Sequence, residues 1–148
     1  MKKNTKKGFT LVELLVVIAI LAILATVSVV GYTAFIDRAN QSNAQTEADQ
    51  IKTIVENVLM TDDYVILVKK SGDSVKGIYA TKNSTGTIEF YEGEPTLKAG
   101  ETSFDATTDV TELTSTGATL TVSSKALSYT NYGYVVNVMT RSASKSAS

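Results

Sequence analysis

An almost unbroken apolar segment near the N-terminus constrains this chain more than any other feature. It runs from Leu14 to Val30 and is interrupted only by Thr26 and Ser28. Counted from Phe9 it has 22 residues, which as an α-helix span about 33 Å, enough to cross a bilayer hydrocarbon core of about 30 Å. The segment therefore predicts a membrane-spanning helix.

The charges around this segment predict its orientation. Four lysines and no acidic residue lie in residues 1–8, whereas the remaining 140 residues carry ten basic and fifteen acidic side chains. By the positive-inside rule, the N-terminus lies in the cytoplasm and the chain beyond about residue 30 lies outside. A secretory signal peptide also starts with basic residues, but its apolar core is only about 7–15 residues long and an Ala-x-Ala site follows it. The apolar run here is longer and no such site follows, so a retained helix is the better interpretation.

The composition excludes most kinds of catalytic site. The chain has 148 residues and a net charge of -1, and it contains no Cys, His or Trp. Disulfides, thiolate nucleophiles, histidine bases and the commonest metal ligands are therefore missing. The near-neutral balance also argues against nucleic-acid binding through a broad basic surface. We expect a non-enzymatic protein without a cofactor or a metal site.

Glu13 is the unusual residue of the apolar segment. A charged side chain in a membrane helix costs about 2.5–3.5 kcal/mol near the bilayer centre and less near an interface, and it usually marks a functional site. Glu13 lies four residues after Phe9, close enough to reach the lipid headgroups. That position explains why the charge is tolerated, but a plain single-span anchor gives no reason for it.

The residues around Glu13 resemble the N-terminus of type IV prepilins and the related pseudopilins. The resemblance is dense over residues 7–25, weaker to about residue 38 and absent beyond. It rests on a short basic leader ending in Gly, then Phe, then Glu four residues later. The matching stretch reads Lys7-Gly8-Phe9-Thr10-Leu11-Val12-Glu13-Leu14-Leu15-Val16-Val17-Ile18-Ala19-Ile20.

The resemblance implies how the N-terminus is processed and used. A membrane-bound prepilin peptidase is expected to cut between Gly8 and Phe9 on the cytoplasmic side and to N-methylate Phe9. Glu13 is expected to meet the Phe9 amine of a neighbouring subunit, which relieves both charges and sets the axial register of a filament. The chain departs from the family pattern at Val30, where a Pro is common, and at Ala22, where a Gly is frequent. The usual cause of a helix kink is therefore missing, although Gly31 could still weaken the helix locally.

These features predict a structural subunit of a type IV pilus. Its partners would be identical subunits, the prepilin peptidase, and a pilus assembly platform with its ATPase. It would be a single-pass protein of the cytoplasmic membrane before assembly and part of an extracellular surface filament afterwards, serving adhesion, motility or surface attachment. One alternative is a pseudopilin of a type II secretion or competence DNA-uptake machine. Another is a membrane-anchored binding domain that never polymerises.

The rest of the chain predicts an α+β fold with a small antiparallel β-sheet head. We expect a basic leader at 1–8, a membrane or filament-core helix at 9–31, its amphipathic continuation at 32–60 and the head domain at 61–148. The continuation carries an apolar stripe with helical spacing, which should pack on the head. The stripe consists of Ile51, Ile54, Val55, Val58 and Leu59.

The head pattern predicts one sheet of about four strands across which the helix packs. Alternation marks strands at 87–91 and 118–122, an apolar run marks a third at 134–139, and 77–81 is a weaker candidate. Residues 64–68 fit either a buried strand or the last turn of the helix. Residues 141–148 are small and polar, and we expect a frayed end.

Two further clusters have plain interpretations. Residues 89–112 carry seven acidic side chains and one lysine, which suggests a calcium loop, but no ligand spacing is recognisable and a solvated loop is preferred. Tyr129, Tyr132 and Tyr134 could bind glycans or DNA by stacking, but strand alternation predicts that they pack in the head.

Overall fold

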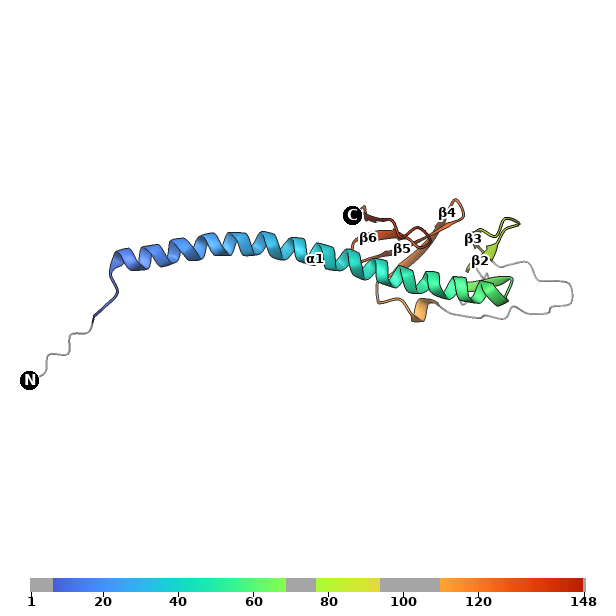
Figure 1. Cartoon of the computed structure of the whole chain (residues 1–148), viewed down its shortest axis with the longest axis horizontal. Coiled ribbons are helices and arrows are strands. Elements are labelled where there is room, and N and C mark those ends of the chain that lie inside the picture. The colour runs from blue at the N-terminus through green and yellow to red at the C-terminus, as the bar shows by residue number, and fades with distance from the viewer. Residues whose placement is uncertain (1–6, 69–76, 94–109, 148) are drawn as a thin grey trace, which may run out of the picture. The chain divides into compact units, whose positions relative to one another are not determined.

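The computed structural model describes residues 7–68, 77–93 and 110–147 and shows an α+β chain (Figure 1). The chain divides into two compact units, residues 1–39 and residues 40–148, and we call the second one the head unit. The elements are α1 (Leu11–Thr61), β1 (Tyr64–Val68), β2 (Ile78–Lys82), β3 (Ile88–Glu92), the short 3-10 helix η1 (Val110–Glu112), β4 (Thr119–Ser123), β5 (Ala126–Asn131), β6 (Tyr134–Asn137) and β7 (Ala143–Lys145).

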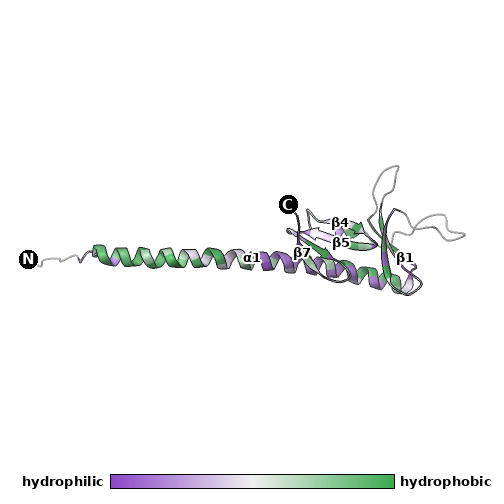
Figure 2. Ribbon diagram, turned by 90° about the horizontal axis from the view of Figure 1, so that it is seen from above, coloured by the Kyte–Doolittle hydropathy of each residue, from purple (hydrophilic) through white to green (hydrophobic). Residues whose placement is uncertain are grey.

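The helix α1 confirms the prediction of one long N-terminal helix. It has 51 residues, no Pro interrupts it, and it stays helical through Gly31. Its hydropathy changes along its length: the N-terminal part is almost uniformly hydrophobic, and polar residues dominate from about residue 37 onward (Figure 2). The two parts of α1 therefore suit different surroundings, an apolar one first and a half-buried one later.

The head unit contains two antiparallel sheets rather than the single sheet of about four strands that the pattern predicted. One sheet has the order β1-β2-β3 and the other the order β4-β5-β6-β7. Every pairing joins strands that are neighbours in sequence, so each sheet is an antiparallel meander. Residues 64–68 form strand β1, which settles the choice between strand and helix end.

The C-terminal part of α1 and both sheets share one hydrophobic core. From α1 the core takes a stripe at Ala44, Ala48, Ile51, Val55 and Leu59, all with at most 5% of their surface exposed. Three residues of the predicted stripe, Ile51, Val55 and Leu59, are thus confirmed as buried, whereas Ile54 and Val58 are half-buried. The stripe extends two turns towards the N-terminus, through a segment rich in polar residues. The strands add further buried residues, which alternate with half-buried ones in β5 and β6. They include Ala80, Phe90, Leu127, Tyr129 and Val136.

Two strands were not predicted from the sequence. Strand β5 buries Leu127 and Tyr129 but follows a turn made of Ser124 and Lys125, which lacks the usual Gly or Asn although both residues have positive φ angles of 50° and 65°. Strand β7 lies within residues 141–148, so the expected frayed end is wrong for Ala143–Lys145. Its small polar residues join the sheet through backbone pairing with β6. Such pairing does not require an alternating apolar pattern, so the sequence does not predict this strand.

The tyrosines and the acidic segment have different outcomes. Packing is confirmed for Tyr129 and Tyr134, which are buried, and Tyr132 is half-buried. Most of the acidic segment, residues 94–109, lies outside the described residues.

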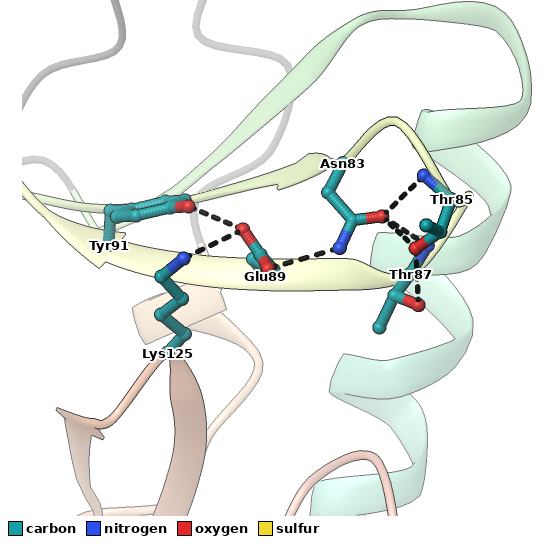
Figure 3. Close-up of polar contacts among 6 residues, drawn as sticks. All are labelled: Asn83, Thr85, Thr87, Glu89, Tyr91 and Lys125. Atoms are coloured by element: carbon teal, nitrogen blue, oxygen red, sulfur yellow. Dashed lines mark hydrogen bonds and ion pairs between the residues drawn. The ribbon is translucent and has the colours of Figure 1, made fainter.

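The two sheets meet where β3 lies against the β4–β5 turn. The Phe90 N–H donates to the Lys125 carbonyl at 3.0 Å, and the Lys125 ammonium lies 3.5 Å from the Glu89 carboxylate. Glu89 also accepts hydrogen bonds from the Tyr91 hydroxyl and, at 3.1 Å, from the Asn83 amide (Figure 3). This polar network links the two sheets at their surface, above the shared core.

Candidate functional site at the start of α1

The first turn of α1 is closed by a reciprocal pair of hydrogen bonds. The Glu13 N–H donates to the Thr10 hydroxyl at 3.2 Å, and the Thr10 N–H donates to the Glu13 carboxylate at 3.3 Å. Thr10 is therefore the N-cap and Glu13 the third helical residue of a capping box. This arrangement satisfies two backbone donors that a helix start otherwise leaves unpaired.

Sequence reasoning assigned Glu13 to contacts between subunits and missed this role within the chain. The signal was available, because a Thr followed three residues later by a Glu before an apolar run is the usual sequence signature of a capping box. The negative charge also lies at the N-terminal end of α1, where the helix dipole favours it. Glu13 thus has a local function that does not depend on any partner.

Gly8 and Phe9 lie just before the helix, in an extended and accessible stretch. Phe9 is 92% exposed, and a Cβ atom added to Gly8 would meet no atom within 4 Å. Nothing in the fold of this chain therefore requires a glycine at position 8. An accessible, non-helical bond between Gly8 and Phe9 is the kind of backbone that a peptidase can bind.

The turns that follow the cap expose a nearly continuous apolar surface. Among the described residues, α1 is the one helix with a stretch long and apolar enough to cross a membrane, and no part of that stretch is buried. Its large exposed side chains, from the start of α1 to the end of the apolar segment, are Leu11, Val12, Leu14, Leu15, Val16, Val17, Ile18, Ile20, Leu21, Ile23, Leu24, Val27, Val29 and Val30. These residues need surroundings other than water.

The few polar side chains of this segment are satisfied by the helix itself. The Thr26 hydroxyl donates to the Ile23 carbonyl at 2.7 Å, and the Ser28 hydroxyl donates to the Leu24 carbonyl at 2.7 Å. Neither hydroxyl therefore needs water, and both can lie in an apolar medium at little cost. Glu13 is the one acidic side chain of this segment, and it lies in the exposed first turn of the helix.

The site has no groups that suggest catalysis or metal binding. Over residues 7–68, 77–93 and 110–147, no cluster of three or more acidic side chains is arranged to hold a metal ion. The structure brings Thr10 and Glu13 together and places Phe9 one residue before the cap. The predicted contact of Glu13 with a Phe9 amine involves two subunits and stays a prediction.

Comparison with known proteins identifies the same segment. Residues 3–29 match the family described as the prokaryotic N-terminal methylation motif. The chain is 34% identical over 84 residues to the type IV major alpha-pilin of Moraxella bovis and 50% identical over 52 residues to a fimbrial protein of Moraxella nonliquefaciens. It is 40% identical over 58 residues to the type IV major fimbrial protein FimA of Dichelobacter nodosus.

These similarities cover part of each protein. They take in 57%, 35% and 39% of this chain and 53%, 34% and 37% of the three relatives, in the same order. The chain therefore spans about half the length of the Moraxella bovis pilin and about a third of the other two. No solved structure is significantly similar to it.

Proposed function

We propose that this chain, which carries the N-terminal segment of the type IV pilin family, is a structural subunit of a type IV pilus. The observation that supports this most is the combination at the start of α1. An accessible Gly8–Phe9 bond is followed by a capped helix that carries one carboxylate and an otherwise apolar surface. The relatives named as major pilins and fimbrial proteins favour a pilus over a secretion-machine pseudopilin.

The apolar surface of α1 explains why such a subunit can have two locations. Burying one large aliphatic side chain is worth about 1.5–3 kcal/mol, so the fourteen exposed ones cannot stay in water. A bilayer shields them before assembly, and packed helices of other subunits shield them afterwards. Because lipid tails are as apolar as Leu side chains, exchanging one environment for the other costs this surface little. The apolar surface of α1 therefore allows the subunit to move from the bilayer into the filament, but it does not specify the axial register between subunits.

Glu13 and the Phe9 amine supply the register in this proposal. Cleavage after Gly8 removes four lysines and leaves a positive amine four residues from the Glu13 carboxylate. Among packed apolar helices each of these charges is costly alone and much less so when paired. The Thr10 cap leaves the Glu13 carboxylate at the helix end, where an amine from a second subunit can reach it. N-methylation of Phe9 keeps the positive charge.

The proposal assigns the remaining partners by their tasks. A prepilin peptidase cuts at Gly8–Phe9 and methylates Phe9, and an assembly platform with its ATPase moves the subunit from the cytoplasmic membrane into the filament. Identical subunits are the main lasting partner. The head unit, residues 40–148, then forms the outside of the filament and contacts surfaces or ligands.

The deciding experiment is to determine the N-terminal mass of the protein in sheared cell-surface material. We expect a chain that starts at methylated Phe9 and sediments with high-molecular-weight filaments. A chain that starts at Met1 or beyond Val30 contradicts the proposal and leaves an anchored or secreted β-rich domain. A correctly processed chain that stays in the membrane fraction favours the pseudopilin alternative.

A further inference from the structure

The head unit contains a cavity that the proposed pilus assembly does not use. It has a volume of about 440 Å³ and lies between α1 and the segment that follows η1. Its lining residues are Asn43, Thr46, Glu47, Gln50, Leu113, Thr114, Ser115 and Tyr132. A second, more apolar hollow of about 550 Å³ shares Thr46, Gln50 and Leu113 with it and continues along α1 to Ile54. Cavities of this size hold small ligands or single side chains.

A carboxylate held by three hydroxyl groups forms one wall of this cavity. Glu47 accepts hydrogen bonds from Ser115 at 2.9 and 3.1 Å, from Tyr132 at 2.9 Å, and from Tyr129. The Asn131 amide in turn donates to the Ser115 and Tyr129 hydroxyls, at 2.8 and 3.2 Å. The orientation of the Glu47 carboxylate is therefore fixed before any ligand arrives.

The backbone at Tyr132 is strained in a way that favours this arrangement. Tyr132 has a φ of 54°, a left-handed conformation that is costly for a bulky side chain. It forms a tight turn with Gly133, whose φ is 77°. Asn is the residue that such a turn prefers at this position, and Tyr132 instead places a hydroxyl within hydrogen-bond distance of Glu47 and Ser115.

The charge of Glu47 is not neutralised within the described part of the chain. The other ion pairs there join Asp49 to Arg141 at 3.0 Å, Glu56 to Lys52 at 3.9 Å and Glu89 to Lys125 at 3.5 Å. No described Lys or Arg lies within 4.0 Å of Glu47. The hydroxyl donors already occupy most of the lone pairs of this carboxylate, so what it still offers a ligand is negative charge.

We propose that this cavity binds a primary ammonium group carried on an aliphatic chain, as in a lysine side chain. The ammonium group lies against the Glu47 carboxylate, and the side-chain amide of Asn43, which makes no hydrogen bond to other described residues, offers a further oxygen acceptor. Leu113, which is 48% exposed, contacts the aliphatic stem. A sugar is a poorer fit, because its hydroxyl groups would have to donate to lone pairs of the Glu47 carboxylate that already accept from Ser115, Tyr129 and Tyr132.

The test is an NMR titration of the full chain in detergent micelles. The probe is N-acetyl-lysine methylamide, and its neutral counterpart is N-acetyl-norleucine methylamide. We expect saturable shifts at Leu113, Ser115 and Tyr132 with the lysine derivative alone. Equal shifts with both compounds, or none with either, overturn the proposal.

Variants at the cavity separate charge from folding. Glu47→Gln removes the charge and should weaken binding of the lysine derivative at least about fivefold. Since this change also alters the hydroxyl network, Gln50→Lys is the second variant: Gln50 is exposed, and a lysine there reaches Glu47 from the same wall and should block the probe. Gln50→Met, of similar size and without charge, should leave binding within about twofold of the unmodified chain. Undiminished binding to Gln50→Lys contradicts the proposed position of the ammonium group.

The natural source of the ammonium group is distinguished in a second titration. Unlabelled full chain is added to the isotope-labelled protein, and the same cavity residues are followed. Lys82 is exposed and makes no ion pair with another described residue, so it is the lysine to change in the added chain. Shifts that Lys82→Met abolishes assign the group to a second copy, whereas no shift, with the lysine derivative still bound, assigns it to a free amine or another protein.

Discussion

At the scale of single residues, Glu13 combines two functions that a substitution can separate. Its carboxylate caps α1 through Thr10, and its charge is proposed to pair with the Phe9 amine of another subunit. Glutamine keeps an oxygen that can accept the Thr10 hydrogen bond, but it carries no charge. Alanine has neither. Comparing the two substitutions therefore distinguishes helix capping from register pairing.

We predict that Glu13→Gln and Glu13→Ala are both processed at Gly8–Phe9 and that neither forms ordered filaments. Without the carboxylate the Phe9 amine has no counter-charge among apolar helices, and that cost falls on assembly rather than on folding. Electron microscopy of sheared material, together with the N-terminal mass of the membrane fraction, measures both steps. Normal filaments from Glu13→Gln alone would show that the cap is what matters. Normal filaments from both variants would contradict the proposed role of Glu13 in setting the filament register.

Gly8 gives a prediction about recognition by another protein. The position is open and its backbone does not require glycine, so a larger side chain leaves the fold intact. We predict that Gly8→Val blocks cleavage and leaves the precursor in the membrane with its four lysines, which cannot enter an apolar filament core. Mass spectrometry of the membrane fraction checks this. Mature protein starting at Phe9 from this variant argues against the assigned peptidase site.

At the scale of elements, α1 packs on the sheets through small residues. Ala44 and Ala48 are fully buried, and both lie in the stretch that the sequence shows as mostly polar. A polar stretch with one alanine per turn presents a narrow apolar line that can face the core. The stripe from Ile51 to Leu59 was predictable from its spacing, whereas the alanine part was not, because alanine contributes little to hydrophobic periodicity.

We predict that Ala48→Leu destabilises the head unit by about 1–3 kcal/mol. Ala48 is fully buried in the shared core, so the larger side chain must displace its neighbours there. Ala34→Leu is the matched control, because Ala34 is exposed on the same helix and the same substitution there meets no packed neighbour. Urea unfolding of the detergent-solubilised full chain, followed by near-ultraviolet circular dichroism, measures the difference. Equal stability of the two variants would mean that α1 and the sheets do not pack tightly at Ala48.

The strands show where sequence patterns stop being informative. Strands β3 and β4 alternate apolar and polar residues between recognisable turns, β6 begins an apolar run, and all three were predicted. Strand β5 alternates equally well, but its first turn is made of Ser124 and Lys125, which do not signal positive φ angles. The Glu47 network was likewise hidden, since Ser115, Tyr129 and Tyr132 lie 68 to 85 residues away from Glu47 in sequence. Only the fold brings such groups together, whereas the residues proposed for processing and assembly, Gly8 to Glu13, are contiguous in sequence.

At the scale of the whole head unit, two sheets share one core and are joined at the surface by the network around Glu89. The hydrogen bond from the Tyr91 hydroxyl, followed by that from the Asn83 amide, holds the pKa of Glu89 below its ordinary value of 4.5. The attraction of Glu89 in turn raises the pKa of Lys125 above its ordinary 10.5. Glu89 and Lys125, which lie in contact in Figure 3, each favour the charged state of the other. The stability of the junction is therefore expected to fall both in acid, where Glu89 takes up a proton, and in alkali, where Lys125 loses one.

The sign of this dependence follows from the direction of each change. A carboxyl group whose pKa is lowered by folding contributes stability above about pH 4.5, and that contribution is lost as the pH falls through the lowered value. A lysine whose pKa is raised contributes stability below about pH 10.5 and loses it as the pH rises further. Both contributions are present near neutral pH. Because Lys125 is 58% exposed and Glu89 is partly exposed, solvent screens the pair and the effect should be modest.

We predict that the thermal midpoint of the head unit falls less steeply below about pH 4.5 in Glu89→Gln than in the unmodified chain. Tyr91 and Asn83 donate to different oxygens of Glu89, so glutamine keeps an acceptor for one of these hydrogen bonds only, and it has no proton to take up in acid. Glu92→Gln is the control, because it removes a carboxylate from the same strand without altering the network around Glu89. Near-ultraviolet circular dichroism of the detergent-solubilised chain between about pH 3 and 7 measures the three midpoints. If all three fall in parallel, the Glu89 network does not couple the two sheets to pH, and their junction rests on the shared core and the Phe90–Lys125 backbone hydrogen bond alone.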